Sequence, residues 1–248
     1  MKIISLVLCV LAAPLFAEPE AKTFKASDGT EVIYRFAAPP KIESGKKYPL
    51  VIFLHGAGER GQDNKAQLKH GVNAILKHSE KIGEPTFLIA PQCPTGIWWT
   101  NVDNNARRTA EQKPITLLDA VLELTENTAE TQAIDPKRIY ITGLSMGGFG
   151  TWAALAKKPD LFAAAIPICG GGDPKTAAAF KHVPIQIFHG DADTVVKPDG
   201  SQKMFDALKQ AGSEAKLTIY PGVAHNSWTQ TYDTQEVNRW LFSPQKPN

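Results

Sequence analysis

Three short motifs in this sequence contain the types of side chain that nucleophilic catalysis by a hydroxyl group requires. They are GLSMG at 143–147, HGDAD at 189–193 and AHNSW at 224–228. A serine hydroxyl is a weak nucleophile unless a histidine removes its proton and a carboxylate orients that histidine. The motifs supply these groups in the order serine, acid, histidine, which is one of the known orders of such a triad. We therefore predict Ser145 as the nucleophile, His225 as the general base and Asp193 as the orienting acid.

The orienting acid has two candidates in the sequence. Asp191 and Asp193 both lie in the loop that follows an expected strand at 185–189. Asp193 is favoured because its longer path from the strand lets the carboxylate reach back toward His225, and Asp191 stays open as the alternative. The other histidines are expected to have local roles, with His55 and His189 in hydrogen bonds at strand ends and His70, His78 and His182 in contact with solvent.

The nucleophile motif needs a particular local structure, and its flanks predict that structure. An apolar run at 139–142 predicts a strand before Ser145, and residues 146–157 predict a helix after it. Small glycines relieve crowding on such a sharp turn. Because a helix start leaves backbone N–H groups free, the Met146 N–H is expected to stabilise an oxyanion formed next to the serine.

The loop HGAGERG at 55–61 supplies the second expected oxyanion donor. It follows an apolar strand at 50–54, and we assign the donor to the Ala57 N–H. The same letters fit the dinucleotide-binding pattern G-x-G-x-x-G, but no helix opens at Gly61 and the next strand lacks the ribose-binding acid. A phosphate loop is excluded as well, because a Gln-Asp pair stands where lysine and serine or threonine are required.

Three tryptophans are candidate substrate-binding residues. Trp98 and Trp99 lie in a long segment at 92–114 near the expected active-site edge, and Trp228 lies three residues after His225. Long segments without regular structure often carry function. An indole ring offers a flat platform for an acyl or aromatic group, but anchoring of the segment in the core is an equally open interpretation for Trp98 and Trp99. For Trp228, bracing of the histidine loop is the favoured role.

Apolar runs alternate with amphipathic stretches along most of the chain. Strands are expected at 50–54, 87–90, 139–142, 163–168, 185–189 and 217–220, with a hairpin of two more at 23–26 and 31–36. Helices are expected at 66–78, 115–127, 146–157, 175–181, 201–211 and 236–242. This alternation predicts the α/β class, with a mostly parallel sheet of about eight strands and helices on both faces. Because about 16 residues separate 168 from 185, no large lid fits there.

Composition excludes several classes of partner. The chain has 27 Lys and Arg against 25 Asp and Glu, a net charge of +2, and no basic cluster longer than Arg107-Arg108, so no nucleic acid partner is expected. Zinc-protease and calcium-loop patterns are absent from the sequence, so no metal or cofactor is expected. Cys93 and Cys169 follow strands that two other strands are expected to separate, and we therefore predict free, buried thiols.

The first 17 residues have the pattern of an export signal. Lys2 supplies a positive charge, residues 3–16 form an apolar run, and Ala17 offers a cleavage site. The run is too short to span a bilayer. We expect residues 1–17 to be a signal peptide, residues 18–248 to form one domain without a membrane span, and the mature protein to be periplasmic or extracellular.

Four stretches of the sequence resemble a known family. FLHGAGERG at 53–61, GLSMGG at 143–148, the Asp193 loop and HNSW at 225–228 are similar to α/β-hydrolase serine esterases of the phospholipase/carboxylesterase type. These are related to polyhydroxybutyrate-depolymerase-like and feruloyl-esterase-like enzymes. The resemblance covers nearly the whole mature chain and implies Ser145, Asp193 and His225 as triad, with Ala57 and Met146 as backbone donors. It leaves the substrate open, because this superfamily performs many reactions on one scaffold.

These observations favour hydrolysis of carboxylic esters through an acyl-serine intermediate, without a cofactor. An open site without a large lid suits bulky or polymer-attached esters, such as acetylated or feruloylated polysaccharide or a polyester. A serine peptidase with the same triad and a secreted binding protein without catalysis are the two alternatives. An ester-versus-amide comparison separates the first, and labelling by a fluorophosphonate separates the second. The sequence does not determine the oligomeric state.

Overall fold

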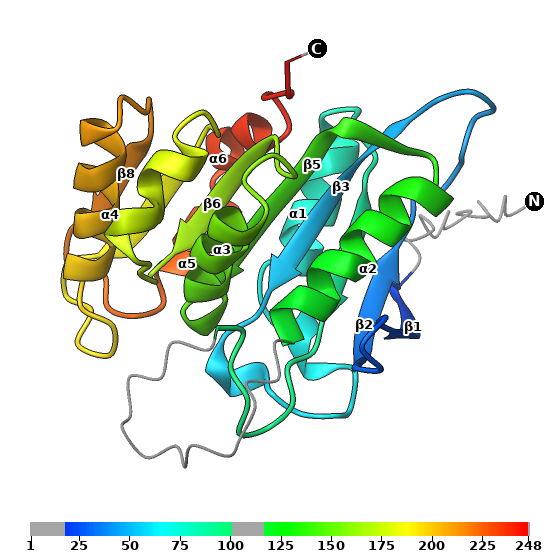
Figure 1. Ribbon diagram of the computed structural model, residues 1–248, viewed down its shortest axis with the longest axis horizontal. Helices are drawn as coiled ribbons and strands as arrows, with labels where there is room; N and C mark the ends of the chain where they lie inside the picture. Colours follow the sequence, from blue (N-terminus) through cyan, green and yellow to red (C-terminus); the bar gives the residue numbers. More distant parts are fainter. Residues whose placement is uncertain (1–17, 101–116, 248) are drawn as a thin grey trace, which may run out of the picture.

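The computed structural model describes residues 18–100 and 117–247. In this part of the chain a single eight-stranded sheet runs through the molecule, and helices cover both of its faces (Figure 1). In sheet order the strands are β1 (Glu20–Lys25), β2 (Glu31–Ala37), β4 (Phe87–Pro91), β3 (Tyr48–Leu54), β5 (Ile134–Leu144), β6 (Ala164–Ile168), β7 (Gln186–Gly190) and β8 (Lys216–Tyr220). The predicted fold class, an α/β-hydrolase sheet of about eight strands, is confirmed.

Strand β2 runs opposite to the other seven strands of the sheet. The β1–β2 hairpin and the β2–β4 pair are antiparallel, whereas β4, β3, β5, β6, β7 and β8 pair in parallel. Parallel neighbours need crossover connections, which is why a helix or helical turn follows most of these strands. The carboxyl ends of the parallel strands therefore meet along one edge of the sheet, where ligands bind in open α/β sheets.

Two layers of helices bury the two faces of the sheet. The helices α1 (Val72–Lys81), α5 (Ser227–Asp233) and α6 (Gln235–Leu241) cover one face, and α2 (Leu117–Thr131), α3 (Met146–Lys157), α4 (Asp199–Gln210) and the 3-10 helix η3 (Pro174–Phe180) cover the other. Strand β3 shows how the sequence sets this up. Leu50 and Ile52 pack into one core and Val51 and Phe53 into the opposite one, because successive side chains of a strand point to opposite faces.

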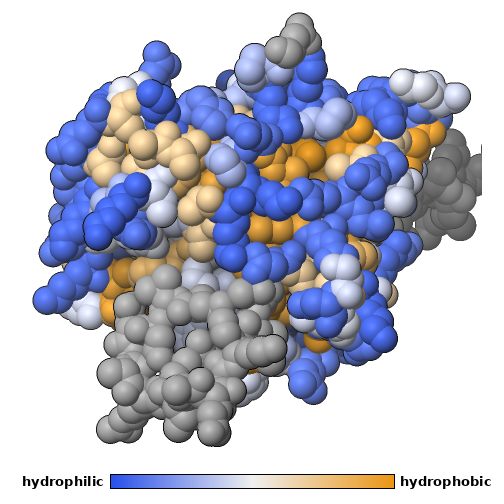
Figure 2. Space-filling view, in the orientation of Figure 1, coloured by the Kyte–Doolittle hydropathy of each residue, from blue (hydrophilic) through white to orange (hydrophobic). Residues whose placement is uncertain are grey.

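The surface carries few large apolar side chains. Among the described residues, the exposed ones are Ile42, Trp98 and Val195. The face drawn in Figure 2 is mostly hydrophilic, and hydrophobic residues come to the surface between α2 and α3. No helix within 18–100 and 117–247 has the length and apolar character needed to cross a membrane.

Several elements differ from the sequence expectation. The helix expected at 66–78 is split into a 3-10 turn, η2 (Ala66–Leu68), and α1, because Gly71 between them has a φ of 74°. A side chain at Gly71 would overlap the rings of Phe53 and Tyr232. Helix α5 was not expected, since its seven residues are too few to show a helical period. The helix expected at 175–181 is the 3-10 helix η3, which Asp173 caps by accepting from the Lys175 N–H.

Two other expectations concern the segments at the carboxyl edge. Cys93 follows β4 and Cys169 follows β6, with β3 and β5 between those strands, and both thiols are free and buried as predicted. The connection between β6 and β7 contains η3 and no large insertion. The expected signal peptide at 1–17 lies outside the described residues.

The closest backbone approach in the fold lies where α3 meets the end of β3, and it yields a prediction. A Cβ on Gly147 would stand 1.9 Å from the Leu54 carbonyl oxygen, so Gly147→Ala forces two backbones apart. We expect a loss of about 3 kcal/mol or more in the free energy of unfolding, measured by urea denaturation. Gly58→Ala is the matched control, since nothing lies within 4 Å of a Cβ there. Equal stabilities of the two variants would contradict this packing.

Candidate active site

The structure brings Ser145, His225 and Asp193 into one hydrogen-bonded chain. His225 Nε2 lies 2.9 Å from Ser145 Oγ, and His225 Nδ1 lies 2.7 Å from Asp193 Oδ2. A carboxylate only accepts, so Nδ1 carries the ring proton and Nε2 is left to accept the serine hydroxyl proton. The Asp193 side chain is fully buried, whereas the His225 side chain is 20% exposed. The histidine thus links an enclosed acid to a serine at the carboxyl edge.

Backbone donors hold the Asp193 carboxylate in its ionised form. Oδ1 accepts from the N–H groups of Val195 and Val196, each at 2.9 Å. Burial raises the pKa of Asp193, but the hydrogen bonds from His225, Val196 and Val195 outweigh it, so the pKa lies below its ordinary value. An ionised acid is what the neighbouring imidazole needs when it takes up a proton.

Asp191, the other candidate acid, points elsewhere. Its Oδ1 accepts from the Gly222 N–H at 2.7 Å, and the residue is exposed. This bond ties the β7 loop to the β8 loop, so Asp191 supports the loop that carries His225 without contacting the imidazole. Between the two alternatives that the sequence left open, the geometry places Asp193 at the histidine.

Ser145 sits on the strained turn between β5 and α3. Its backbone has φ 52° and ψ −115°, a conformation that residues other than glycine rarely adopt. A Cβ on Gly143 would lie 2.3 Å from the Gly147 carbonyl oxygen, so both flanking glycines are required by backbone contact. The Ser145 N–H donates to the Ile168 carbonyl at 2.9 Å, which fastens the turn to the end of β6.

Two backbone N–H groups next to the serine are left without acceptors. Within 18–100 and 117–247, neither the Met146 N–H nor the Ala57 N–H makes a hydrogen bond. Met146 is the first residue of α3, and Ala57 opens the 3-10 turn η1 (Ala57–Glu59) after β3. A Cβ on Gly56 would touch Leu144, which shows that the η1 loop lies against the nucleophile turn. These are the two donors that the sequence analysis assigned to an oxyanion.

His55 sets the direction of the Ala57 N–H. Its Nε2 accepts from the Cys93 N–H at 2.9 Å, so Nδ1 carries the proton and donates to the Gly56 carbonyl at 2.6 Å. In a trans peptide the C=O and N–H point in opposite directions, and the described chain has no cis peptide. Holding the Gly56 carbonyl toward His55 therefore turns the Ala57 N–H away from it. Burial lowers the pKa of His55 to about 4, which keeps the ring neutral.

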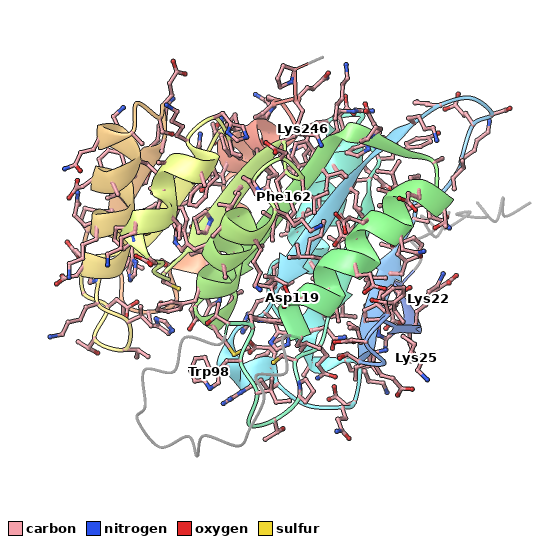
Figure 3. All side chains as sticks on the ribbon, viewed as in Figure 1. Lys22, Lys25, Trp98, Asp119, Phe162 and Lys246 are labelled. Atoms are coloured by element: carbon pink, nitrogen blue, oxygen red, sulfur yellow. The ribbon has the colours of Figure 1, made fainter. Side chains whose placement is uncertain are left out.

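The three tryptophans have three different environments. Trp99 is 1% exposed and its Nε1 donates to the His55 carbonyl at 2.9 Å, so it anchors its segment in the core. Trp98 is 47% exposed, with the Arg60 guanidinium 5.4 Å from its ring, and Figure 3 shows it beyond the carboxyl end of the sheet. Trp228 stands edge-on to the His225 ring, with the centroids 5.3 Å apart. That contact fits the bracing role.

His70, His78 and His182 make no described hydrogen bond to the triad. His182 is exposed at 51% of its side chain, and His70 pairs with Glu59 at 3.6 Å. The expectation that His78 contacts solvent is wrong, because its residue is 7% exposed and packs on the buried side of α1. His78 is buried because it lies on the face of α1 that packs against the core. The sequence did not indicate this burial, because histidine is polar.

One cluster in the described chain has the composition of a metal site. Ligand atoms of Cys169, Asp193 and His225 lie within 4.8 Å of one another. A thiol binds a metal as thiolate, and burial raises the pKa of Cys169 to about 12. His225 and Asp193 are also bonded to each other. The cluster is better described as the triad with a neutral thiol beneath it.

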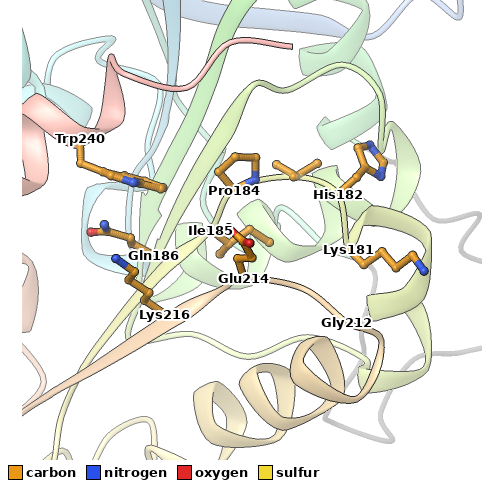
Figure 4. A pocket seen from close by; sticks show the side chains of 10 residues that line it. Lys181, His182, Pro184, Ile185, Gln186, Gly212, Glu214, Lys216 and Trp240 are labelled. Atoms are coloured by element: carbon orange, nitrogen blue, oxygen red, sulfur yellow. The ribbon is translucent and has the colours of Figure 1, made fainter. Parts of the chain in front are cut away.

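A separate hollow lies at the opposite edge of the sheet. It has a volume of about 360 Å³ and is lined by residues that include Lys181, Gln186, Lys216 and Trp240 (Figure 4). Gln186 and Lys216 are the first residues of β7 and β8, so this hollow stands at the amino ends of the strands. The reacting groups stand at the carboxyl ends, and the hollow is not part of their site.

Comparison with known proteins agrees with this geometry. Residues 100–239 match the Dienelactone hydrolase family. The chain belongs to that family. The matched range contains all three residues of the hydrogen-bonded chain Ser145, Asp193 and His225.

Individual proteins are also similar to this chain. The crystal structure of a thermostable esterase is 39% identical and superposes with a TM-score of 0.85, covering 94% of this chain and 64% of that one. Poly(3-hydroxyalkanoate) depolymerase C of Paucimonas lemoignei is 27% identical, over 78% of this chain and 51% of its own length. Acyl-protein thioesterase 1 of Neurospora crassa is 28% identical, over 75% and 83%. The chain thus spans about half of the depolymerase.

The neutral state of His55 makes the stability of this family member depend on pH. In the unfolded chain the imidazole takes up a proton below its ordinary pKa of 6.5, whereas the folded chain takes it up near 4. The unfolded state therefore binds more protons between these values, and stability falls as the pH falls from about 6.5 to about 4. We expect this residue to contribute a loss of up to about 3 kcal/mol in the free energy of unfolding.

Urea denaturation across this pH range checks the contribution. His55→Gln should be less stable at neutral pH and should show a flatter pH dependence than the wild type. His182→Gln is the matched control, because that side chain is exposed, and it should retain the wild-type slope. Parallel pH profiles for His55→Gln and wild type would rule out the buried neutral imidazole as their cause.

Proposed function

We propose that this protein is a serine esterase that hydrolyses carboxylic esters through an acyl-enzyme intermediate. The observation that carries the proposal is His225, which bridges Ser145 at 2.9 Å and Asp193 at 2.7 Å. The unpaired N–H groups of Ala57 and Met146 beside the serine support it. The three relatives described above, which are named as an esterase, a poly(3-hydroxyalkanoate) depolymerase and an acyl-protein thioesterase, also support it.

The geometry supports a two-step reaction. Ser145 Oγ attacks the ester carbonyl while His225 Nε2 takes the hydroxyl proton, and the charge on the carbonyl oxygen is stabilised by the Ala57 and Met146 N–H groups. The ester C–O bond then breaks, and His225 gives its proton to the leaving alcohol. Water, deprotonated by His225, then attacks the acyl-serine. The bond between the acyl carbon and Ser145 Oγ breaks, the carboxylic acid leaves, and His225 returns the proton to Oγ. Asp193 stays ionised throughout and stabilises the imidazolium.

The substrate class is part of the same proposal. Bulky or polymer-attached esters are favoured because the described connection between β6 and β7 contains η3 and no large insertion. Ser145 is itself partly exposed, and Val195, two residues after Asp193, is 72% exposed. A hollow of about 420 Å³ lies along α3 and is lined by Phe149, four residues after Ser145, and by Trp152 farther along the helix.

Hydrolysis of p-nitrophenyl esters with acyl chains of two to twelve carbons tests the mechanism. Ser145→Ala should lower kcat/KM by about 10³-fold or more, because the residual rate comes from the oxyanion donors and binding. Asp193→Asn should cause a loss of similar order. Asp191→Asn is the matched control and should stay within a few-fold of wild type, since Asp191 contacts the Gly222 N–H and no imidazole.

Different outcomes would redirect the proposal. Equal rates for Ser145→Ala and wild type would remove the serine mechanism. Faster cleavage of p-nitroanilides than of matched esters would indicate a peptidase. If the protein is an esterase, comparing its rates on acetylated xylan, methyl ferulate and poly(3-hydroxybutyrate) film would define the alcohol and acyl groups that it prefers.

We also propose that the protein is exported after removal of residues 1–17. The support is the sequence pattern of charge, apolar run and small residue at that end. Expression in a bacterial host followed by fractionation should place the protein in the periplasm or medium. Intact-mass measurement should show a chain beginning within a few residues of Glu18, and a cytoplasmic, full-length product would contradict the proposal.

A further inference from the structure

We propose that His189 is a positioning residue that shares the Asp193 carboxylate with His225 and thereby adjusts the basicity of the general base. This inference rests on the proposed function, because it assigns a role within that triad. His189 lies on β7, four residues before Asp193, and its side chain is fully buried. The sequence motif HGDAD contained this residue, but the sequence analysis gave it a local role.

The contacts of His189 define its protonation on one side of the ring. Nε2 lies 3.2 Å from Asp193 Oδ2 and 2.8 Å from the Val196 carbonyl oxygen. An ionised carboxylate and a carbonyl are both acceptors, so Nε2 must carry a proton and donate to them. Asp193 Oδ2 therefore receives N–H groups from two imidazoles, His189 and His225, while Oδ1 receives two backbone N–H groups.

The other side of the ring fixes His189 to the scaffold. Nδ1 lies 2.8 Å from Ser201 Oγ, and the same hydroxyl oxygen lies 2.9 Å from the Gly170 carbonyl oxygen. Ser201 is buried on α4, and Gly170 follows the end of β6. The imidazole is thus held between β6, β7 and α4. Its hydrogen bond in turn holds the Asp193 carboxylate in place. A carboxylate with four donors has one orientation in which all are satisfied.

The shared carboxylate has a consequence for His225. Each N–H that donates to Oδ2 draws on the same negative charge, and that charge stabilises the protonated form of His225. Removing the His189 donor leaves more of that charge to stabilise the protonated imidazole of His225. In the pH profile of kcat/KM, the acidic limb reports deprotonation of the general base in the free enzyme. This limb should therefore move to higher pH in a variant that lacks the His189 donor.

Three other ionisable side chains, Cys169, Asp191 and His70, lie near this pair. Cys169 faces Asp193 and His225 from the end of β6, and its raised pKa keeps it a neutral thiol where esterase assays are run. Asp191 lies on the same loop as Asp193 but accepts from the Gly222 N–H. His70 contacts the Trp228 ring, which stands next to His225, and pairs with Glu59. None of the three donates to the Asp193 carboxylate within the described contacts.

Two substitutions of His189 separate positioning from packing. His189→Gln places an amide N–H near the position of Nε2 and keeps a donor for Asp193. His189→Asn is shorter, places its amide near Nδ1, and loses that donor. For His189→Asn we expect kcat/KM to fall about 10-fold, the effect of one hydrogen bond to a charged group, and the acidic limb to rise by about half a pH unit or more. His189→Gln should return the limb to the wild-type position.

A measurement on the wild-type protein keeps the inference testable if His189→Asn does not fold. In ¹⁵N-labelled protein at pH 8, the histidine signal that disappears in His189→Gln should show a protonated Nε2 with a slowly exchanging proton. An unprotonated Nε2 would overturn the inference. So would a His189→Asn variant that loses thermal stability yet keeps the wild-type acidic limb, since that is the result of packing alone.

These results are distinct from a failure of the proposed function. If Ser145→Ala retains full esterase activity, the triad mechanism fails whatever His189 does. If Ser145→Ala is inactive, and the two His189 variants share the wild-type acidic limb, the mechanism stands and the positioning role fails. The nuclear magnetic resonance measurement reports the bond between His189 and Asp193 in either case.

Discussion

The contact between α3 and the end of β3 determines the rest of the site. Gly147 lies so close to the Leu54 carbonyl that the helix can start only where both flanks of the serine lack side chains. This approach forces Ser145 into its unusual backbone conformation and leaves the Met146 N–H free next to the hydroxyl. The strain is held by hydrophobic packing on both faces of β3, where every residue is buried.

Buried imidazoles hold the groups around this turn. His55 holds a carbonyl on the β3 side and so aims one oxyanion donor, while His189 holds the carboxylate on the β7 side. Both rings are enclosed, and both form bonds through each nitrogen. A fully bonded ring inside a protein has little rotational freedom, so each serves as a rigid spacer between loops that have no regular structure.

Much of this arrangement was predictable because it is local. The pattern of strand, Gly-x-Ser-x-Gly and helix fixed the turn at Ser145, and chain order selected His225. The split at Gly71 was not visible, since it depends on the distant rings of Phe53 and Tyr232. The roles of His55 and His189 also depended on partners 38 and 12 residues away, which no sequence period reveals.

The order in which the strands lie in the sheet also affects the rate of folding. His225 follows β8 and bonds to groups 80 and 32 residues earlier in the chain, which follow β5 and β7. Parallel strands that are far apart in the sequence pair slowly, because the crossover segment between them must first be closed into a loop. The three groups meet only when β5, β6, β7 and β8 lie side by side. Recovery of activity during refolding therefore requires these four strands to have paired, whereas the signal of helix formation does not.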